Sequence, residues 1–469
     1  MAQNPLCFVV MPFNQKPDPA GGPDIDFNRI YKEALEPGIE AADMQPIRAD
    51  EERAGGIIHK PMFERLLLCE YAVADLTTAN ANVFYELGVR HTARPATTLT
   101  IFAEHQPIPF DVNFLRSLPY DLGENNQFGK KQAEALREAV TKRLHELRDL
   151  ANSRESIDSP LFELLKEWKP GNIAHLKTDT FREQVQENED FKRRLAAIRE
   201  TGKAKENRGD ARQALADFRN DVSPLDAVEM STVVDLMLTY RALEDWDGMI
   251  ELFGAMPEEL KRQILVREQL GFAYNRRAGD TKSAPDRSEA LRILLEVEAQ
   301  QGASSETCGL MGRIHKDKWS EALTENDKLE AMGCLNNAID AYRRGFLADQ
   351  RDAYPGVNLL TLLDVKGDEK SLVEEKRLLP VVRFAVERRL AGGEPDYWDH
   401  ATMLELAVLE GDPNESQEHL ANAVAAIRET WEPGTTANNL RIIERARESR
   451  GVDTGWITEI ITYLEARAK

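Results

Sequence analysis

The stretch Ala74–His91 constrains the fold more than any other part of this sequence. It begins with an apolar segment that ends at Asp75, continues through a turn rich in Thr and Asn, and then shows apolar residues at helical spacing from Val83 onward. Asn80 or Asn82 is a suitable N-cap for that helix. The pattern predicts a buried strand that passes through a short loop into a helix, which is the repeating unit of a parallel α/β sheet.

Two carboxylates and two amides in this stretch are candidate ligand-binding groups. Ligands of open α/β sheets bind at the carboxyl ends of the strands. Asp75 ends a strand and Glu86 lies in the first turns of the next helix, so both are expected at one rim. With Asn80 and Asn82 they suit the hydroxyls of a sugar better than a phosphate. Structural roles stay open for each: an Asx turn for Asp75, a helix-dipole contact for Glu86 and a helix cap for one asparagine.

Strand and helix signals alternate over residues 6–125. Strands are expected at 6–10, 44–48, 73–76 and 98–102. Helices are expected at 27–42, 57–71 and 83–92. This alternation predicts right-handed βαβ units in a parallel sheet of four or five strands, with helices on both faces.

The first and second strands add further candidate residues at the same edge. Met11, Pro12 and Phe13 follow the first strand, and Phe13 either stacks on a base or plugs the core. Arg48 ends the second strand, where a positioned guanidinium is a candidate partner for a phosphate. The Pro- and Gly-rich segment 17–24 is either a flexible connection or a lid over the site.

This region resembles the superfamily of nucleoside 2-deoxyribosyltransferases and Toll/interleukin-receptor (TIR)-like domains. The matching segments are Phe8–Phe13, Ala72–Thr77 and Asn82–Gly88. The resemblance covers roughly the first quarter of the chain. It implies a flavodoxin-like α/β domain over residues 1–125. It also implies that Glu86 acts on the anomeric carbon of a nucleoside or dinucleotide, while Asp75 and Asn80 contact its ribose.

Composition and charge weigh against several classes of protein. The formal net charge of −21 disfavours a nucleic-acid surface. No apolar run approaches the roughly 18 residues that cross a bilayer, and the first residues do not form a signal peptide. No metal-ligand cluster, GxGxxG or Walker A loop occurs, so we expect no metal and no bound cofactor. The four cysteines, Cys7, Cys69, Cys308 and Cys334, are scattered and form no CxxC pair. Cys7 and Cys69 lie in apolar segments and are expected to be buried, reduced thiols, and we expect a cytoplasmic location.

Residues 174–469 show helix signals only, joined by short turns rich in Gly, Pro and Asp. A helical linker is expected over 126–173. Several helix pairs carry small residues where paired helices would approach closely, such as Gly271 and Gly312, in an echo of the tetratricopeptide pattern. The sequence therefore predicts an all-α solenoid of degenerate, tetratricopeptide-like repeats.

Three segments of this half resemble the tetratricopeptide-like regulatory region of the apoptosis signal-regulating kinases, which is labelled a TRAF-binding domain. They are Tyr342–Phe346, Arg351–Asn358 and Asp396–Thr402. In those kinases a TIR-like module also precedes the helical region. The sequence contains no kinase Gly-rich loop, HRD or DFG motif, so it does not predict a kinase.

Two functions fit these patterns. The first is an effector that cleaves the N-glycosidic bond of NAD or a related nucleotide, with Glu86 as the catalytic residue and the solenoid as its regulator. The alternative is a non-catalytic, nucleotide-sensing scaffold that recruits proteins through the solenoid, since solenoid surfaces usually bind other proteins. Protein partners and self-association into a homo-oligomer are expected in both cases.

Overall fold

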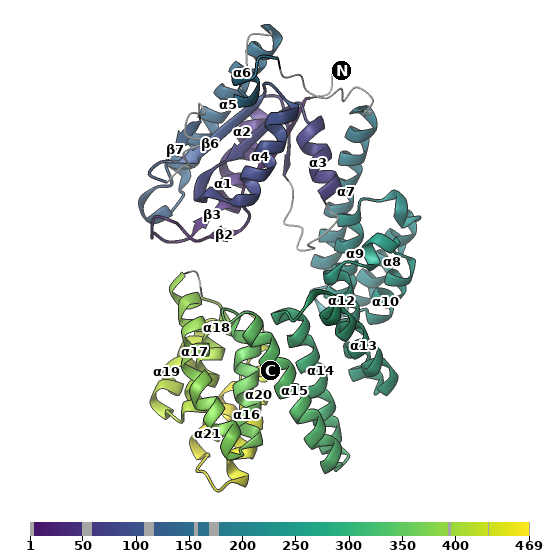
Figure 1. Ribbon diagram of the computed structural model, residues 1–469, viewed down its shortest axis with the longest axis vertical. Coiled ribbons are helices and arrows are strands. Elements are labelled where there is room, and N and C mark those ends of the chain that lie inside the picture. The colour runs from purple at the N-terminus through teal and green to yellow at the C-terminus, as the bar shows by residue number, and fades with distance from the viewer. Residues whose placement is uncertain are drawn as a thin grey trace. The chain divides into compact units, whose positions relative to one another are not determined.

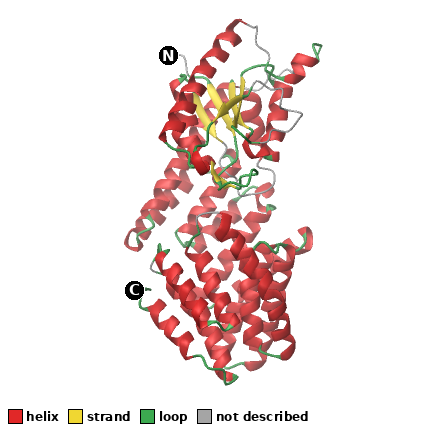
Figure 2. Ribbon diagram, turned by 90° about the vertical axis from the view of Figure 1, so that its left-hand side faces the viewer, coloured by secondary structure: helices red, strands yellow, loops and turns green. Residues whose placement is uncertain are grey.

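The structure is a computed structural model that describes residues 4–48, 59–106, 117–153, 158–167, 178–392, 395–429 and 431–468. The chain divides into two units, Met1–Thr239 and Tyr240–Lys469. Among the described residues, strands occur only in the first unit, and no strand follows Tyr120 (Figures 1 and 2). None of the described helices combines the length and apolar character needed to cross a membrane.

A five-stranded parallel sheet forms the centre of the first unit, as the alternating pattern predicted (Figure 1). The strand order is β4-β1-β5-β6-β7. The strands are β1 Leu6–Val10, β4 Gln45–Arg48, β5 Tyr71–Asp75, β6 Thr98–Ala103 and β7 Leu118–Tyr120. Strand β1 lies between β4 and β5, with Phe8 opposite both Ile47 and Ala72. Two short antiparallel strands, β2 Gln15–Lys16 and β3 Ile25–Asp26, were not expected.

Helices cover both faces of the sheet because successive side chains of each strand point to opposite sides. Cys7 and Val9 of β1 belong to a core shared with the helical segment 27–41, which comprises α1 Phe27–Ile30, a π-helical turn Tyr31–Leu35 and α2 Glu36–Ala41. Phe8 and Val10 belong to a second core on the other face. That core includes α3 His59–Leu68 and α4 Ala81–Ala93.

Helix α5, Lys130–Ser153, packs on the face that also carries α1 and α2. Its apolar side chains Leu136, Val140 and Leu144 are buried in the core that contains Val73 of β5. Part of the segment expected as a helical linker over 126–173 therefore belongs to the packed layers of the α/β region. The expected domain boundaries stay a prediction.

The rest of the first unit is helical: α6 Pro160–Leu164, α7 Thr178–Thr201, α8 Arg208–Asp221 and α9 Met230–Ala242, which runs into the second unit. A buried ion pair joins these helices to the sheet layers. The Arg65 guanidinium of α3 lies 3.0 Å from the Glu229 carboxylate, just before α9, and the Asn188 amide of α7 donates to the same carboxylate. Both charged side chains of the pair are less than a tenth exposed.

The second unit consists of helices that follow one another through short turns, as the sequence predicted (Figure 1). The helices are α10 Trp246–Ala255, α11 Glu258–Lys261, α12 Ile264–Thr281, α13 Ala284–Gln301, α14 Ser305–Thr324, α15 Lys328–Ala348, α16 Ala353–Lys366, α17 Glu369–Gly392, α18 Tyr397–Glu410, α19 Pro413–Ala425, α20 Glu432–Ser449 and α21 Gly455–Glu465. Side-chain oxygens cap many of their N-termini. The capping residues include Asp245, Ser283, Ser304, Asp327, Asp352, Asp396 and Asp412.

Glycines allow close contact within the helix pairs at the places that the repeat pattern indicated. A Cβ atom at Gly312 of α14 would lie 2.8 Å from the ring of Tyr342 in α15, and one at Gly271 of α12 would lie 3.0 Å from Leu294 in α13. The Tyr342 side chain is fully buried, so its ring has little room to move. Close pairing of these helices therefore depends on Gly271 and Gly312, which have no side chain.

We predict that Gly312→Ala lowers the free energy of unfolding by about 1–2 kcal/mol, because the cost of overpacking exceeds the gain in helix propensity. Chemical denaturation followed by circular dichroism measures the change. Gly333→Ala is the matched control, since a Cβ there meets open space on α15. It should stabilise the protein by up to about 1 kcal/mol. Equal effects of both substitutions would contradict this account of the pairing.

Candidate functional site

The carboxyl edge of the sheet contains a buried polar network centred on Asp75. Tyr120 Oη, at the end of β7, donates to Asp75 Oδ2 at 2.9 Å, and the Thr77 backbone N–H donates to Oδ1 at 3.0 Å. Thr77 Oγ1 lies 3.1 Å from Tyr120 Oη and accepts a hydrogen bond from the Ala103 N–H at 2.8 Å. The network joins the ends of β5, β6 and β7.

Asp75 therefore does not line an open rim. Its side chain is fully buried, and protein donors occupy both carboxylate oxygens. Burial raises its pKa to about 6, although the hydrogen bonds from Thr77 and Tyr120 oppose this effect. The geometry corresponds to the Asx-turn role that the sequence left open for Asp75, and a ribose hydroxyl would have to displace Tyr120 to reach it.

The two asparagines of the turn have different roles: one caps the helix α4 and the other is exposed. Asn80 is the N-cap of α4, and its side-chain oxygen accepts from the backbone N–H groups of Asn82 and Val83 at 2.9 and 3.4 Å. Asn82 is exposed on the first turn of the helix. The cap that the sequence predicted for one of these residues is Asn80, which leaves the Asn82 side chain directed to solvent.

Pro12 and Phe13, which follow the first strand, do lie next to Arg48, as expected. However, Arg48 uses its interactions on these residues instead of presenting a free guanidinium to a ligand. The Arg48 guanidinium lies between two aromatic rings, 4.5 Å from the Phe13 centroid and 4.8 Å from that of Tyr31. It donates to the Pro12 carbonyl at 3.2 Å and to the Asn28 side chain at 2.9 Å. The ring of Phe13 is thus covered by a cation.

Met11 is buried in the core on the α1 and α5 face instead of forming a wall of the expected site. The segment 17–24 is held in place by polar contacts. Asp18 accepts hydrogen bonds from the Gln106 side chain at 2.6 Å and from the Asn126 side chain at 2.9 Å. Asn126 also donates to the Pro23 carbonyl at 2.6 Å. These contacts tie both ends of the segment to the neighbouring loops.

Glu86 keeps the properties of a candidate catalytic carboxylate. It is half-buried on α4, and it makes no hydrogen bond or ion pair with any residue that the structure describes. Burial raises its pKa to about 7. A carboxyl group with this pKa exchanges protons readily near neutral pH, which suits general acid–base chemistry. Glu86 does not share a cleft with Asp75, because Asp75 is enclosed.

Arg90 was not among the residues singled out from the sequence. It is the largest fully buried side chain among the residues of the first unit that the structure describes. Its guanidinium donates to the carbonyls of Leu66, Cys69 and Glu70, at 2.8, 2.7 and 3.1 Å, at the end of α3. Arg94, one turn later, donates to two further carbonyls of α3. The pKa of Arg90 falls to about 10 through burial, so it stays protonated at neutral pH. In the sequence, the signal that could have identified this role is the spacing of Arg90 and Arg94, four residues apart on a helix with apolar residues at helical spacing.

A second candidate site lies on the helices of the second unit and contains exposed arginines and aromatic rings. The guanidinium carbons of Arg241 and Arg276 lie 4.4 and 4.9 Å from the centroid of the Phe272 ring. Arg313 and Tyr354 are close enough to shift the pKa of Arg276. We call these five residues, on α9, α12, α14 and α16, the arginine–aromatic face.

Part of the arginine–aromatic face is exposed to solvent. The Tyr354 side chain is 49% exposed, yet its pKa is raised, primarily by burial. Arg276 is also exposed, and burial followed by the charge of Arg313 lowers its pKa. Arg313 is paired with Asp317 at 3.0 Å, whereas Arg276 contacts the Phe272 ring.

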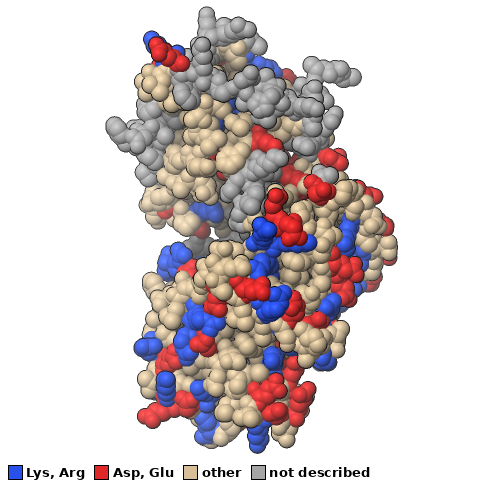
Figure 3. Space-filling model, turned by 45° about the vertical axis from the view of Figure 1, so that its right-hand side comes forward, with Lys and Arg blue, Asp and Glu red and all other residues tan. Residues whose placement is uncertain are grey.

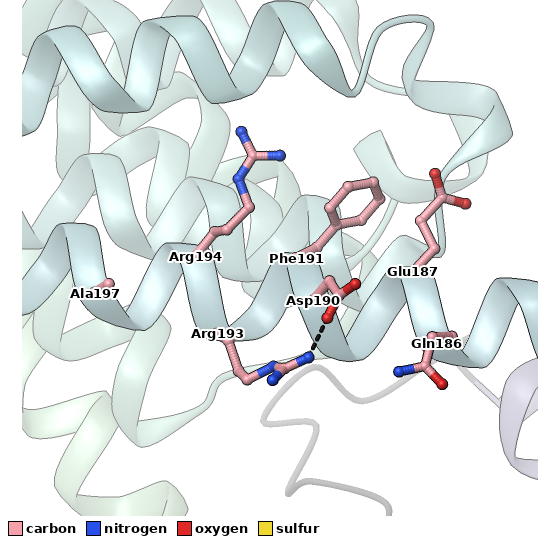
Figure 4. A pocket seen from close by; sticks show the side chains of 7 residues that line it. All are labelled: Gln186, Glu187, Asp190, Phe191, Arg193, Arg194 and Ala197. Atoms are coloured by element: carbon pink, nitrogen blue, oxygen red, sulfur yellow. Dashed lines mark hydrogen bonds and ion pairs between the residues drawn. The ribbon is translucent and has the colours of Figure 1, made fainter.

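A groove of about 860 Å³ runs along α7 in the first unit (Figure 4). Arg193 pairs with Asp190 on the same helix, and Arg194 pairs with Asp221 while lying over the Phe218 ring. These basic residues are thus paired with acidic side chains of the same unit. Among the described residues, no group of three or more His, Cys, Asp or Glu side chains is arranged to hold a metal ion.

The model of one protein family, the MAP3K TRAFs-binding domain, matches residues 83–463. This match covers most of the sequence, from α4 to α21. The chain belongs to the MAP3K TRAFs-binding domain family. The three segments that resembled the apoptosis signal-regulating kinases all lie within the matched range.

Curated relatives of this family member are large kinases. The chain is 32% identical to mitogen-activated protein kinase kinase kinase nsy-1 of Caenorhabditis elegans over 235 residues, which are 47% of this chain and 15% of that protein. It is 28% identical to mitogen-activated protein kinase kinase kinase 15 of Mus musculus, over 48% of this chain and 17% of the relative. The alignment with mitogen-activated protein kinase kinase kinase 6 of Homo sapiens shows 26% identity over 44% of this chain and 16% of that protein. The matches thus span less than a fifth of each kinase.

Among solved structures, a tetratricopeptide repeat protein from Parabacteroides merdae matches with a TM-score of 0.33 and 10% identity. The match covers 61% of this chain and 98% of that one.

We predict that Tyr120→Phe lowers the free energy of unfolding by about 1–3 kcal/mol, because it leaves a buried carboxylate oxygen of Asp75 without a donor. Urea denaturation at pH 7.5 measures the loss. Tyr71→Phe is the control, since the Tyr71 hydroxyl forms no hydrogen bond with the described residues. If both variants unfold at the same urea concentration as the unmodified protein, the network does not stabilise the sheet edge.

Proposed function

We propose that this chain is a signalling scaffold whose helical region binds a protein partner of the TRAF class. The family match carries the proposal, because it covers the helices of the second unit and its name describes a region that binds TRAF proteins. The relatives that share the region are kinases of signalling cascades.

The arginine–aromatic face is the surface that we assign to this partner. Tyr and Arg are enriched among the residues that dominate binding energy in protein interfaces. Arg276 and Arg241 on the Phe272 ring, together with half-exposed Tyr354, supply this composition. On the visible face of the helical region, basic and acidic side chains are interspersed (Figure 3).

Two accompanying proposals concern assembly and location. Exposed apolar side chains at the junction of α14 and α15, namely Leu323, Leu329 and Met332, offer a surface for self-association into a homo-oligomer. All four cysteines are free and buried, which suits the reducing cytoplasm. Neither proposal involves nucleic acid or a membrane.

We predict that the purified chain binds a recombinant TRAF protein saturably in isothermal titration calorimetry, and that Arg276→Glu weakens this binding at least tenfold. The substitution reverses a charge on the arginine–aromatic face and removes the contact with Phe272. Arg388→Glu makes the same charge change at an exposed position of α17 and should bind like the unmodified chain. The absence of saturable binding would contradict the proposal, and equal loss in both variants would contradict the assignment of the face.

Glu86 supports a second candidate function in the N-terminal region, namely cleavage of the N-glycosidic bond of NAD or a related nucleotide. Two observations favour it. The sheet order, with the second strand outside the first and the third to fifth on its other side, is that of flavodoxin-like folds, which suits a TIR- or deoxyribosyltransferase-like domain. Glu86 is also a carboxylate without a described partner near the carboxyl edge. NAD would be a substrate here and not a resident cofactor.

If this second function is correct, incubation of the chain with NAD should release nicotinamide, detected by chromatography. The reaction needs ionised Glu86 beside an oxocarbenium-like centre. Since the pKa of Glu86 is about 7, the rate should rise between pH 6 and pH 8. Glu86→Gln should abolish the activity, whereas Glu64→Gln on α3 should not. No release by the unmodified chain, at any protein concentration tested, would leave the scaffold as the whole function.

A further inference from the structure

A cavity of about 330 Å³ lies among α16, α17, α18 and α20 of the second unit. Its size falls at the lower end of ligand pockets, which span roughly 300–1,000 Å³. Its apolar wall consists of Leu372, Leu379, Pro380 and Leu409, and its charged wall consists of Asp364, Glu375, Lys376, Glu410 and Arg447.

Most of the charges around the cavity are already paired within the protein. Asp364 accepts from Arg447 at 3.1 Å and from Arg450 at 2.8 Å. Arg447 also donates to the carbonyls of Val408 and Leu409, both at 2.8 Å. The guanidinium donors are therefore engaged, and an anionic ligand would have to compete with Asp364 for them.

Glu410, which also lines the cavity, is paired as well. Its carboxylate forms an ion pair with Arg383, which also contacts Glu415 at 2.5 Å. Lys376 lines the cavity too, but its side chain is exposed. The remaining wall residue with a charged group is Glu375.

Glu375 makes no hydrogen bond or ion pair with any residue that the structure describes, although its side chain is only 5% exposed. Its pKa is raised to about 7, first by burial and then by the charge of Asp364, while Arg447 and Arg450 oppose the shift. A buried carboxylate without a donor is costly. The cavity thus contains a hydrogen-bond acceptor, the Glu375 carboxylate, that has no donor among the described residues.

Helix α17 supplies a second acceptor at the same place. Pro380 lies inside the helix and has no N–H, so the carbonyl of Lys376 lacks its usual partner four residues later. Both residues line the cavity. A carboxylate and a backbone carbonyl beside an apolar wall match a ligand that has several N–H donors and a short hydrocarbon stem.

We propose that this cavity binds an alkylguanidinium or alkylammonium group, which donates to Glu375 while its stem packs against Leu372, Leu379 and Leu409. The group is either a small free amine or guanidine, or the arginine or lysine side chain of a protein partner. This site is separate from the arginine–aromatic face and does not depend on the TRAF proposal.

Binding of this cation is coupled to the titration of Glu375. Below pH 7 the carboxyl group holds a proton, which a cation must displace; above pH 7 it is already ionised. The charged groups that face it are Asp364, Glu410, Lys376, Arg447 and Arg450. Linkage then predicts that affinity rises roughly tenfold between pH 6 and pH 8.

The test is isothermal titration calorimetry of the full chain with n-butylguanidine, and separately with the pentapeptide Ala-Ala-Arg-Ala-Ala. We expect saturable binding at one site for at least one probe, with the pH dependence above. Tighter binding of the free guanidine assigns a small-molecule ligand, and tighter binding of the peptide assigns a partner side chain. Glu375→Gln should weaken binding at least tenfold and remove the pH dependence.

Glu387→Gln is the matched control, because it removes the same charge from an exposed position of α17. It should bind like the unmodified chain. Equal weakening in both variants would show only nonspecific attraction to an acidic protein and would overturn the site, as would the absence of saturable binding. Thermal unfolding at pH 8 tests the premise independently. Glu375→Gln should raise Tm, since it removes an ionised, unpartnered carboxylate, and a lower Tm would overturn the premise.

Discussion

Within each unit, a buried arginine binds backbone carbonyls at the end of a neighbouring helix and holds the helices of that unit together. The last four carbonyls of an α-helix have no partner within the helix, and they carry the negative end of its dipole. Arg90 satisfies such carbonyls at the end of α3 while almost fully buried, and so fixes α3 and α4 on one face of the sheet. Arg447 does the same for α18 and at the same time pairs with Asp364 of α16. Each guanidinium has five donors, so one side chain can join three segments.

In the second unit a buried polar chain connects α14, α16, α18 and α20. The Lys316 ammonium of α14 donates to Asn439 of α20 at 3.4 Å, and Asn439 donates to Glu405 of α18 at 3.0 Å. Burial lowers the pKa of Lys316 to about 8 and raises that of Glu405. Lys316 also reaches Asn358 of α16, one turn after Tyr354. Two of the helices that carry the arginine–aromatic face, α14 and α16, are thus held together within the chain itself. This lowers the entropic cost of the partner binding that we propose.

Local patterns predicted the elements better than they predicted the roles of polar residues. The parallel sheet and the helical remainder follow from apolar runs and turn residues that are close in sequence. The role of Asp75 depends on Tyr120, which is 45 residues away, so the sequence left both an Asx turn and a ribose contact open. The helix α5 has the amphipathic pattern of a linker helix, and only the core shows that it covers the sheet. The isolation of Glu86 and Glu375 is likewise a property of three-dimensional surroundings.

The central claim is that this member of the MAP3K TRAFs-binding domain family works through its helical surface. Amide hydrogen exchange of the full chain, with and without a saturating TRAF protein, tests it most directly. The account predicts slower exchange in peptides from α12, α14 and α16, which carry four of the five residues of the arginine–aromatic face, and unchanged exchange in the segment from β5 to α4. Slower exchange confined to the β5–α4 segment, with no change in the three helices, would contradict it.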